Sequence, residues 1–399
     1  MDKAGAKIIE LRKLAFLKQV FWLSLTAFGG PQVHFTRFTD VLVKKRRFIS
    51  EEELLEINSF CQMLPGPTST QTITTIAYRR GGPVFATIAL TIWALPSCFL
   101  MGALAQIVSL FGSNLNVVKV LQYVPAMAVG FMCFAAIRFT LQMVKNQIHA
   151  GILIFTALVP IIYSHPVFIP ILLVLGGFIT NLTTGKTLIK PQDSFANIKW
   201  GNLWVFAGIW ILAALFGNLM QNRPALLFEN TYRYGSLVFG GGNVLVPMMY
   251  DQYVLFKHYM DHQTFMTGVG MSQALPGPVF SISSYANGMA LSSMGAWVMI
   301  LGSVIGSVAI FLPGLLLIFF FHPIWYRLKT YNRVQKAIEG INAASAGLVV
   351  AAAVLLIRPI QWNVGNACII TATIAYLWWG KCPTPLLVLA ILIVGAFVG

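Results

Sequence analysis

The stretch Gln62-Met-Leu-Pro-Gly-Pro67 recurs as Gln273-Ala-Leu-Pro-Gly-Pro278, 211 residues further along the chain. The stretch Phe28-Gly-Gly-Pro31 recurs at the same offset as Phe239-Gly-Gly-Gly242. An ordered series of matches at one period indicates an internal repeat. We therefore expect two homologous halves, each interrupted at two glycine- or proline-rich positions.

Composition places these repeats in a membrane. The chain has 399 residues, of which 57% are hydrophobic and 10% are charged. Soluble domains are about 25% charged, so a water-soluble globule and a disordered chain are both excluded. Long apolar runs recur to the end of the chain, which favours helices over the short alternating strands of an outer-membrane barrel. The expected fold is an all-α polytopic membrane protein.

The halves are expected to have inverted topologies. We divide the chain into a transporter repeat at 1–190, a linker with one connecting transmembrane helix at 191–224, and a second repeat at 225–399. Each half begins with two broken segments, at about 14–47, 53–80, 225–256 and 262–289. The extra crossing inverts the second half, and inverted repeats with broken helices are typical of secondary transporters. Whether the broken segments are re-entrant hairpins or full spans stays open.

The net charge of +15 is interpreted as the usual excess of Lys and Arg in cytoplasmic loops, not as a nucleic-acid surface. With a cytoplasmic N-terminus, most basic residues fall on the inner side. We expect a multi-pass protein of the bacterial inner (plasma) membrane, with the lipid bilayer as its partner and no nucleic acid. The sequence leaves a homodimer open.

The Pro-Gly-Pro breaks predict a binding site. Proline interrupts a helix, and the helix that restarts exposes amide donors and the positive end of its dipole. Such donors must face protein, water or a ligand inside a membrane, and an anion suits them. Hydroxyls recur at the common offset after the breaks, because Thr70 matches Ser281 and Thr72 matches Ser283.

The Phe-Gly-Gly motifs offer two more helix starts, and inversion would bring all four toward one centre. A single break is more simply a kink or a close-packing glycine, but four matched breaks with shared hydroxyls favour a site for a doubly charged oxyanion. The expected substrate-binding residues are Gly29, Gly30, Gln32, His34, Gln62, Gly66, Thr68, Ser69, Thr70, Thr72, Arg233, Gly241, Asn243, Gln273, Gly277, Ser281 and Ser283.

Some of these candidates have two interpretations. The amides of Gln62 and Gln273 would bind the oxyanion or cap the broken helix. His34 would gain a proton as the anion binds, or form a hydrogen-bonded core histidine. Arg233, on an otherwise apolar helix, is a functional candidate or extends its charge to the outer interface.

Two further features have local explanations. Asp40 and Asp251 share the offset of 211 residues and are expected near the membrane interfaces, as helix caps or in a pair with Lys44. The acidic residues that follow Ser50 predict the first turn of a helix.

Motifs of soluble enzymes do not occur in the sequence. We find no phosphate-binding Gly-rich loop with Lys, no HExxH and no CxxC. We therefore expect no catalytic residues, no metal ligands and no cofactor. This pattern argues against an enzyme and an ATP-driven pump, and for a secondary transporter.

The motifs resemble those of the chromate ion transporter family. Phe28-Gly-Gly-Pro-Gln-Val-His34, Gln62–Pro67 and Leu95-Pro-Ser97 resemble its N-terminal half. Phe239-Gly-Gly-Gly-Asn-Val-Leu-Val-Pro247 and Gln273–Pro278 resemble its C-terminal half. The resemblance covers almost the whole chain and is to the long, two-domain members.

The resemblance implies efflux of chromate from the cytoplasm, which would confer chromate resistance. Sulfate is the close structural analogue, and the membrane potential or the proton gradient would drive transport. Uptake or exchange of sulfate or another oxyanion is the first alternative. A non-transporting membrane scaffold or sensor is the second.

Overall fold

The computed structural model describes residues 3–112, 114–163, 168–183, 200–220, 222–239, 241–325, 332–380 and 383–398. Every regular element in these ranges is a helix. Four helical segments in them are long and apolar enough to cross a membrane: Thr68–Phe111, Leu115–Met143, Ala296–Ile324 and Arg333–Ile357. The expectation of an all-α polytopic membrane protein is confirmed.

The first half begins with broken helices. Its elements in chain order are α1 (Lys3–Thr26), α2 (Pro31–Phe38), the π-helix η1 (Thr39–Lys45), α3 (Glu51–Gln62) and α4 (Thr68–Phe111). A break inside α4 occurs at Gly82, whose φ is 77°, directly before Pro83. This break divides α4 at the point where the sequence predicted one segment to end and the next to begin.

The second half has a matching series of elements. They are α10 (Arg223–Leu237), α11 (Gly242–Tyr250), the π-helix η2 (Asp251–Phe256), α12 (His262–Ser272), the 3₁₀ turn η3 (Val279–Ser281), α13 (Ile282–Ala290), the 3₁₀ turn η4 (Ser292–Met294) and α14 (Ala296–Phe321). Four of these elements, η3 to α14, stand where the first half has α4. In both halves a short α-helix runs directly into a π-helix. Because π-helices are rare, their occurrence at matching places supports the interpretation of the chain as a repeat.

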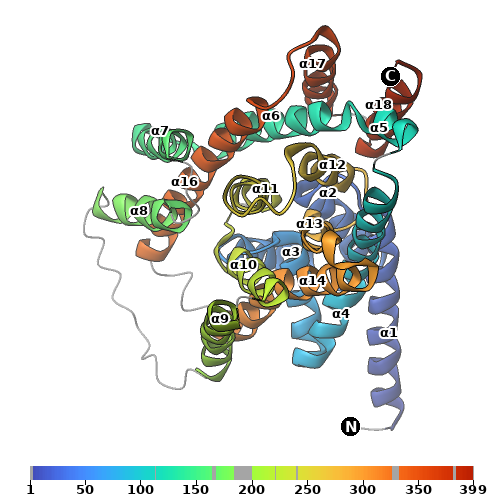
Figure 1. Ribbon diagram of the computed structural model, residues 1–399. Helices are drawn as coiled ribbons and strands as arrows, with labels where there is room; N and C mark the ends of the chain where they lie inside the picture. Colours follow the sequence, from blue (N-terminus) through green and yellow to red (C-terminus); the bar gives the residue numbers. More distant parts are fainter. Residues whose placement is uncertain are drawn as a thin grey trace.

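The remaining helices surround these broken segments (Figure 1). They are α5 (Leu115–Leu121), α6 (Val124–Met143), α7 (Gln147–Ile162), α8 (Phe168–Thr183), α9 (Gly201–Met220), η5 (His322–Ile324), α16 (Asn332–Ile357), α17 (Val364–Trp379) and α18 (Thr384–Val398). Helix α9 is the connector between the halves. The separate helix α5 was not predicted, because it is short and its residues continue the apolar run into α6.

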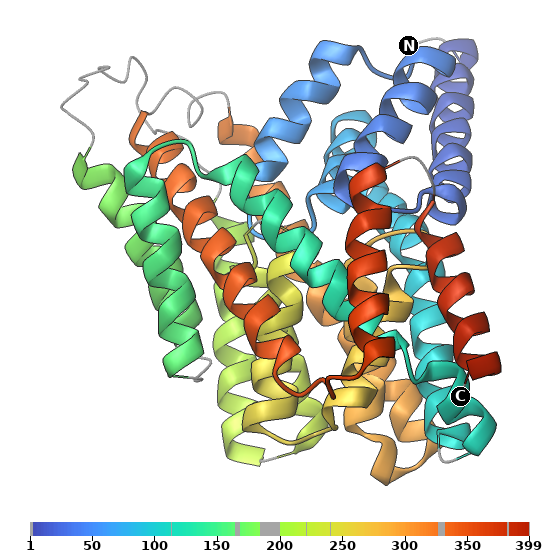
Figure 2. The same ribbon diagram turned by 90° about the horizontal axis from the view of Figure 1, so that it is seen from above.

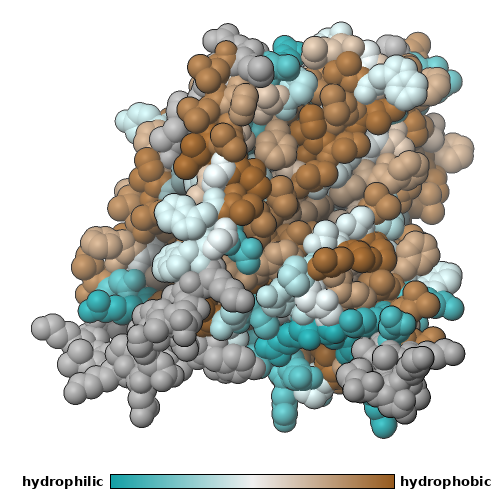
Figure 3. Space-filling model, turned by 90° about the horizontal axis from the view of Figure 1, so that it is seen from below, coloured by the Kyte–Doolittle hydropathy of each residue, from teal (hydrophilic) through white to brown (hydrophobic). Residues whose placement is uncertain are grey.

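The two halves place their broken segments at opposite ends of the molecule. In Figure 2 the blue helices α1 to α3 gather at one end, while the yellow segments of the second half extend to the other. This arrangement supports the predicted inversion. The flank of the molecule is largely apolar, and a hydrophilic rim lies at one end of it (Figure 3).

Two local predictions are confirmed: the start of α3 after Ser50, and the pairing of Asp40 with Lys44. Ser50 caps α3 in a reciprocal capping box with Glu53, as predicted. Asp40 pairs with Lys44 at 3.1 Å, also as predicted. Asp251 differs from Asp40 in its exposure, because only 5% of this residue is exposed. It is buried because α11 packs against α16 and Asp251 lies beside residues of α16, a contact that the sequence does not indicate. The expectation that Asp251 lies near a membrane interface stays a prediction.

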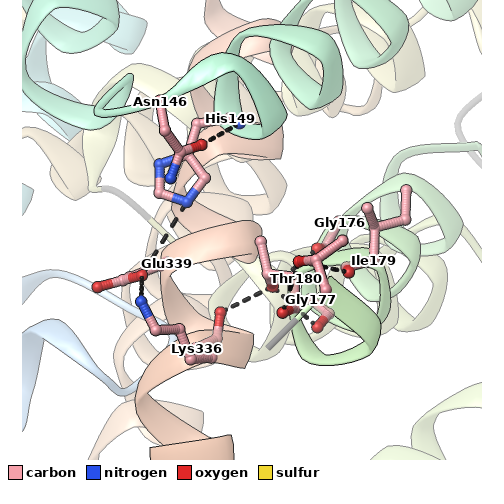
Figure 4. Close-up of polar contacts among 9 residues, drawn as sticks. Asn146, His149, Gly176, Gly177, Ile179, Thr180, Lys336 and Glu339 are labelled. Carbon is pink, nitrogen blue, oxygen red and sulfur yellow. Dashed lines mark hydrogen bonds and ion pairs between the residues drawn. The ribbon is translucent and has the colours of Figure 1, made fainter. Parts of the chain in front are cut away.

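Helices α7, α8 and α16 form one closely packed unit. A Cβ on Gly340 of α16 would collide with the carbonyl oxygen of Gly176 on α8. The Thr180 hydroxyl donates to the Lys336 carbonyl oxygen at 2.8 Å (Figure 4). Nε2 of His149 on α7 lies 4.0 Å from a carboxylate oxygen of Glu339 on α16. Small residues and polar contacts thus hold the three helices together.

This packing predicts that Gly340→Ala destabilises the protein. Overpacking of this kind costs about 1–3 kcal/mol, so we expect a lower melting temperature for the detergent-purified variant. Gly151→Ala on α7 is the matched control, because nothing lies within 4 Å of a Cβ at that position. Equal melting temperatures for the two variants would contradict the close approach of α8 and α16.

Candidate functional site

The four predicted breaks are glycine turns with matching backbone conformations. Gly30 precedes α2 with a φ of 84°, and Gly241 precedes α11 with a φ of 85°. In the two Pro-Gly-Pro turns, Gly66 has a φ of 121° and Gly277 has a φ of 98°. Residues with a side chain rarely adopt this region, which explains why glycine stands at all four positions.

The halves exchange backbone hydrogen bonds at these turns. The amide of Gly66 donates to the carbonyl oxygen of Val238 at 2.7 Å, and the amide of Gly277 donates to that of Ala27 at 2.9 Å. Ala27 and Val238 are themselves 211 residues apart. Each Pro-Gly-Pro turn therefore pairs with the chain just before the Gly-Gly turn of the other half.

Two further contacts join the turns within each half. Nδ1 of His34 on α2 lies 3.0 Å from the hydroxyl of Ser69 at the start of α4. A Cβ on Gly242, the first residue of α11, would lie 3.0 Å from Cγ1 of Val279 in η3. Together with the exchanged hydrogen bonds, these contacts connect all four breaks in a closed ring, which we call the four-turn ring.

The helices that start at the ring lack side-chain caps. No side chain caps α2, α4, α11 or η3 at Gly30, Pro67, Gly241 or Pro278. Side chains cap α3, α5, α7, α12 and α17, whereas α6, α10 and α14 lack a side-chain cap as the ring helices do. The first-turn amides of a helix have no acceptor within the helix. The ring thus brings together helix starts whose amide donors and positive dipole ends suit an anion.

The hydroxyls of the first half are already partnered. Ser69 contacts His34, Thr70 accepts from the Trp93 indole at 3.2 Å, and Thr72 donates to the Thr68 carbonyl oxygen at 2.8 Å. In the second half, the Ser283 hydroxyl lies 3.8 Å from the sulfur of Met249. Ser281 is 2% exposed, and no hydrogen bond of its hydroxyl appears among the described residues. Its hydroxyl is therefore available to a ligand.

His34 has the environment of a neutral core histidine. Its Nε2 lies 3.2 Å from the carbonyl oxygen of Ala27, which only accepts, so Nε2 carries the hydrogen. Nδ1 is then free to accept from the Ser69 hydroxyl. Both ring nitrogens are satisfied without a second proton, which supports the core interpretation of His34.

Three candidates lie outside the ring. Gln62 ends α3 and is exposed, while Gln273 is half-buried and its backbone oxygen accepts from Thr384. Arg233 pairs with Glu229 of the same helix at 3.4 Å and donates to Asn230. Its charge is thus balanced locally on α10.

The remaining candidates complete the comparison. Gly29 is exposed, with a φ of 99°, and Thr68 is half-buried at the start of α4. The side chains of Gln32 and Asn243 lie outside the described residues.

Gln71 is a ring residue that the sequence analysis missed. It is 2% exposed, its amide nitrogen donates to the Pro65 carbonyl oxygen at 2.7 Å, and its side-chain oxygen has no partner. It packs between the Gly66 turn and Gly314 of α14. Comparison of the two halves did not reveal Gln71, because the equivalent residue in the second half is the apolar Ile282. Its polar position within a Thr-rich apolar segment was the available signal.

Two cavities in the described chain lie away from the ring. One of about 460 Å³ is lined by Thr371, Ile374, Ala375, Trp378 and Trp379 on α17. Another of about 10 Å³ lies beside Asp251. Neither borders the four turns. The ring residues Thr70, Gln71 and Ser281 are each only 2% exposed, so they are packed against protein in this conformation.

Comparison with known proteins agrees with the transporter architecture. A family model described as "Chromate transporter" matches residues 14–181 and 225–399, which leaves out the connector α9. No solved structure matches the chain.

Three curated relatives align over most of their length. An uncharacterised transporter of Methanocaldococcus jannaschii is 23% identical over 96% of this chain and 92% of its own. A probable chromate transport protein of Synechococcus elongatus is 24% identical over 98% of both chains. A chromate transport protein of Cupriavidus metallidurans is 23% identical over 94% of this chain and 90% of its own.

The ring predicts that Gly66→Ala and Gly277→Ala destabilise the protein to similar degrees. Strain from a side chain at positive φ costs about 1–3 kcal/mol. In addition, the new Cβ would lie 2.8 Å from the Gln71 side-chain nitrogen or 3.1 Å from the Ser97 hydroxyl. Thermal unfolding in detergent measures the effect, with Gly208→Ala in the open surroundings of α9 as control. A melting temperature equal to that of the control would contradict the ring.

Proposed function

Because this chain belongs to the chromate transporter family, we propose that it exports chromate or a similar tetrahedral oxyanion from the bacterial cytoplasm across the inner membrane. Membership and the apolar helices make it a multi-pass membrane transporter. The observation that carries the proposed site is the ring of four uncapped helix starts, joined across the two halves.

Neutral donors suit a transported dianion. Amides and hydroxyls hold a tetrahedral oxyanion through hydrogen bonds, as they do at other helix starts. A buried ring of arginines would hold the same ion more tightly and slow its release. Arg233, the charged candidate, is already paired with Glu229. The proposed site therefore binds through backbone amides and through hydroxyls such as that of Ser281.

The charge distribution supports a cytoplasmic N-terminus. The exposed run Lys44–Arg47 begins in the last turn of η1 and continues past its end, and basic residues are retained on the cytoplasmic side. Whatever the orientation of the chain, the inside-negative potential drives a dianion outward. The available free energy is about 4.6 kcal/mol per 100 mV for two charges, which drives extrusion without ATP.

Alternating access follows from the same architecture. The four-turn ring is packed in this conformation, so substrate must reach it through movement of the surrounding helices. We propose that the inverted halves rock about the ring and expose it to each side in turn, as in other inverted-repeat transporters.

Removal of the Ser281 hydroxyl tests the proposed contact. Ser281→Ala is expected to weaken chromate binding about 10- to 150-fold, because a hydrogen bond to a charged group contributes about 1.5–3 kcal/mol. Calorimetric titration of the purified protein with chromate measures the affinity. Ser59→Ala is the matched control, since the Ser59 hydroxyl bonds within α3 and is exposed. Unchanged affinity in Ser281→Ala would remove Ser281 from the site.

The direction of driven flux tests the proposed energetics. Efflux of radiolabelled chromate from loaded proteoliposomes should accelerate when valinomycin and a potassium gradient set the interior negative, and slow when the sign is reversed. Competition with unlabelled sulfate in the same assay ranks the two oxyanions. Flux that ignores the potential would contradict dianion export, and absence of any flux would favour a scaffold or sensor.

A further inference from the structure

Asp251 is a buried carboxylate without a counter-charge. It is the first residue of η2 and is 5% exposed, and no ion pair of its side chain occurs among the described residues. Its repeat equivalent Asp40 lies at the matching junction with η1, pairs with Lys44, and has 42% of its side chain exposed. The equivalent aspartates of the two halves therefore differ in both exposure and pairing.

A small cavity adjoins this carboxylate. The cavity has a volume of about 10 Å³, close to the smallest that holds one water. Among the residues of the described ranges that line it, Asp251 is the only polar one. The apolar lining residues are Pro247 and Met248 of α11, Pro160 of α7, Ile169 of α8, and Leu348, Ala351, Ala352 and Leu355 of α16.

The ionisable groups around the cavity do not neutralise Asp251. Tyr234 on α10 and the adjacent Tyr250 are close enough to interact with its charge, and neither is a cation. On α10, Arg233 is paired with Glu229. Arg138 on α6 is exposed and stacks on Phe134.

The other charged groups of α7 and α16 lie away from the cavity lining. Arg358, three residues after Leu355 of the cavity, is exposed. The ionic cluster of α7 and α16, formed by His149, Lys336 and Glu339, lies toward the other end of those helices (Figure 4). Glu339 precedes the first α16 residue of the cavity, Leu348, by about 13 Å at 1.5 Å per residue. The residues of α8 that line the cavity include no ionisable group.

Burial of an unpaired carboxylate in such surroundings favours its neutral form, because a charge without a partner loses its hydration. The cavity lies where α11 and η2, which continue from the four-turn ring, meet the closely packed unit of α7, α8 and α16 (Figure 1). When Asp251 is protonated and uncharged, α11 and η2 can pack against the α7, α8 and α16 unit without water between them. Loss of the proton places a negative charge between these two groups of helices, and this favours their separation or the entry of water.

We propose that Asp251 is a proton-binding site that couples proton movement to oxyanion transport. The inference rests on the proposed transport function. In each cycle the carboxylate takes up one proton while its cavity is open to one side, forming an uncharged carboxylic acid. It releases the same proton to the other side after the helices have moved. The α-to-π junction at Tyr250 and Asp251 links this step mechanically to the ring, since α11 begins at Gly242.

The test measures chromate flux in proteoliposomes under an imposed pH gradient, with the membrane potential clamped at zero by valinomycin and equal potassium. Coupling to one proton changes the final chromate ratio across the membrane about tenfold per pH unit, since one pH unit is one tenfold step in proton activity. Asp251→Asn keeps the size of the neutral acid and should abolish this dependence. Asp40→Asn, the matched control, should retain it.

A second measurement covers the case in which the variant is unstable. Chromate addition to detergent-purified wild-type protein, followed with a pH indicator dye, should release or take up a proton, and Asp251→Glu should preserve that signal. A gradient response retained in Asp251→Asn would overturn the proposal. A wild-type flux indifferent to the pH gradient would also overturn it and leave the proposed transport function standing. Absence of chromate counterflow in the wild-type protein would instead refute the proposed function itself.

Discussion

Two backbone hydrogen bonds hold the centre of this protein together. Gly66 donates to Val238, and Gly277 donates to Ala27, so each half completes the interrupted chain of the other. Inside a membrane an unpaired amide costs several kcal/mol, and neither half can satisfy these donors alone. The exchange therefore makes the two halves interdependent, and it brings the four helix starts to one place.

The need to pair backbone amides inside a membrane also explains why the centre suits an anion. The turns use their glycine amides to join the halves, but the first turns of the restarted helices keep donors that no side chain caps. Their dipoles supply partial positive charge without a buried cation. At the proposed site a dianion would be attracted and would still be free to leave, as transport requires.

Differences between the halves are as informative as their likeness. His34 bridges α2 and α4, but Leu245 stands at its equivalent position. Asp40 lies in a surface ion pair, whereas Asp251 is enclosed by α11 and the α7, α8 and α16 unit. Duplication supplies a symmetric framework, and the divergence of single residues within it permits roles that the two halves do not share.

The sequence by itself determined the all-α membrane fold, the four breaks and the helix restart at Thr68, because proline, glycine and apolar length act locally. It also identified the Asp40–Lys44 pair, which lies four residues apart on one helical surface. Only the tertiary structure decided which carbonyls receive the Gly66 and Gly277 amides, that Gln71 joins the ring, and that Asp251 is buried. These features depend on contacts between segments far apart in the chain. The acceptors at Ala27 and Val238 are backbone carbonyls, which any residue carries, so the pattern of side chains does not identify them.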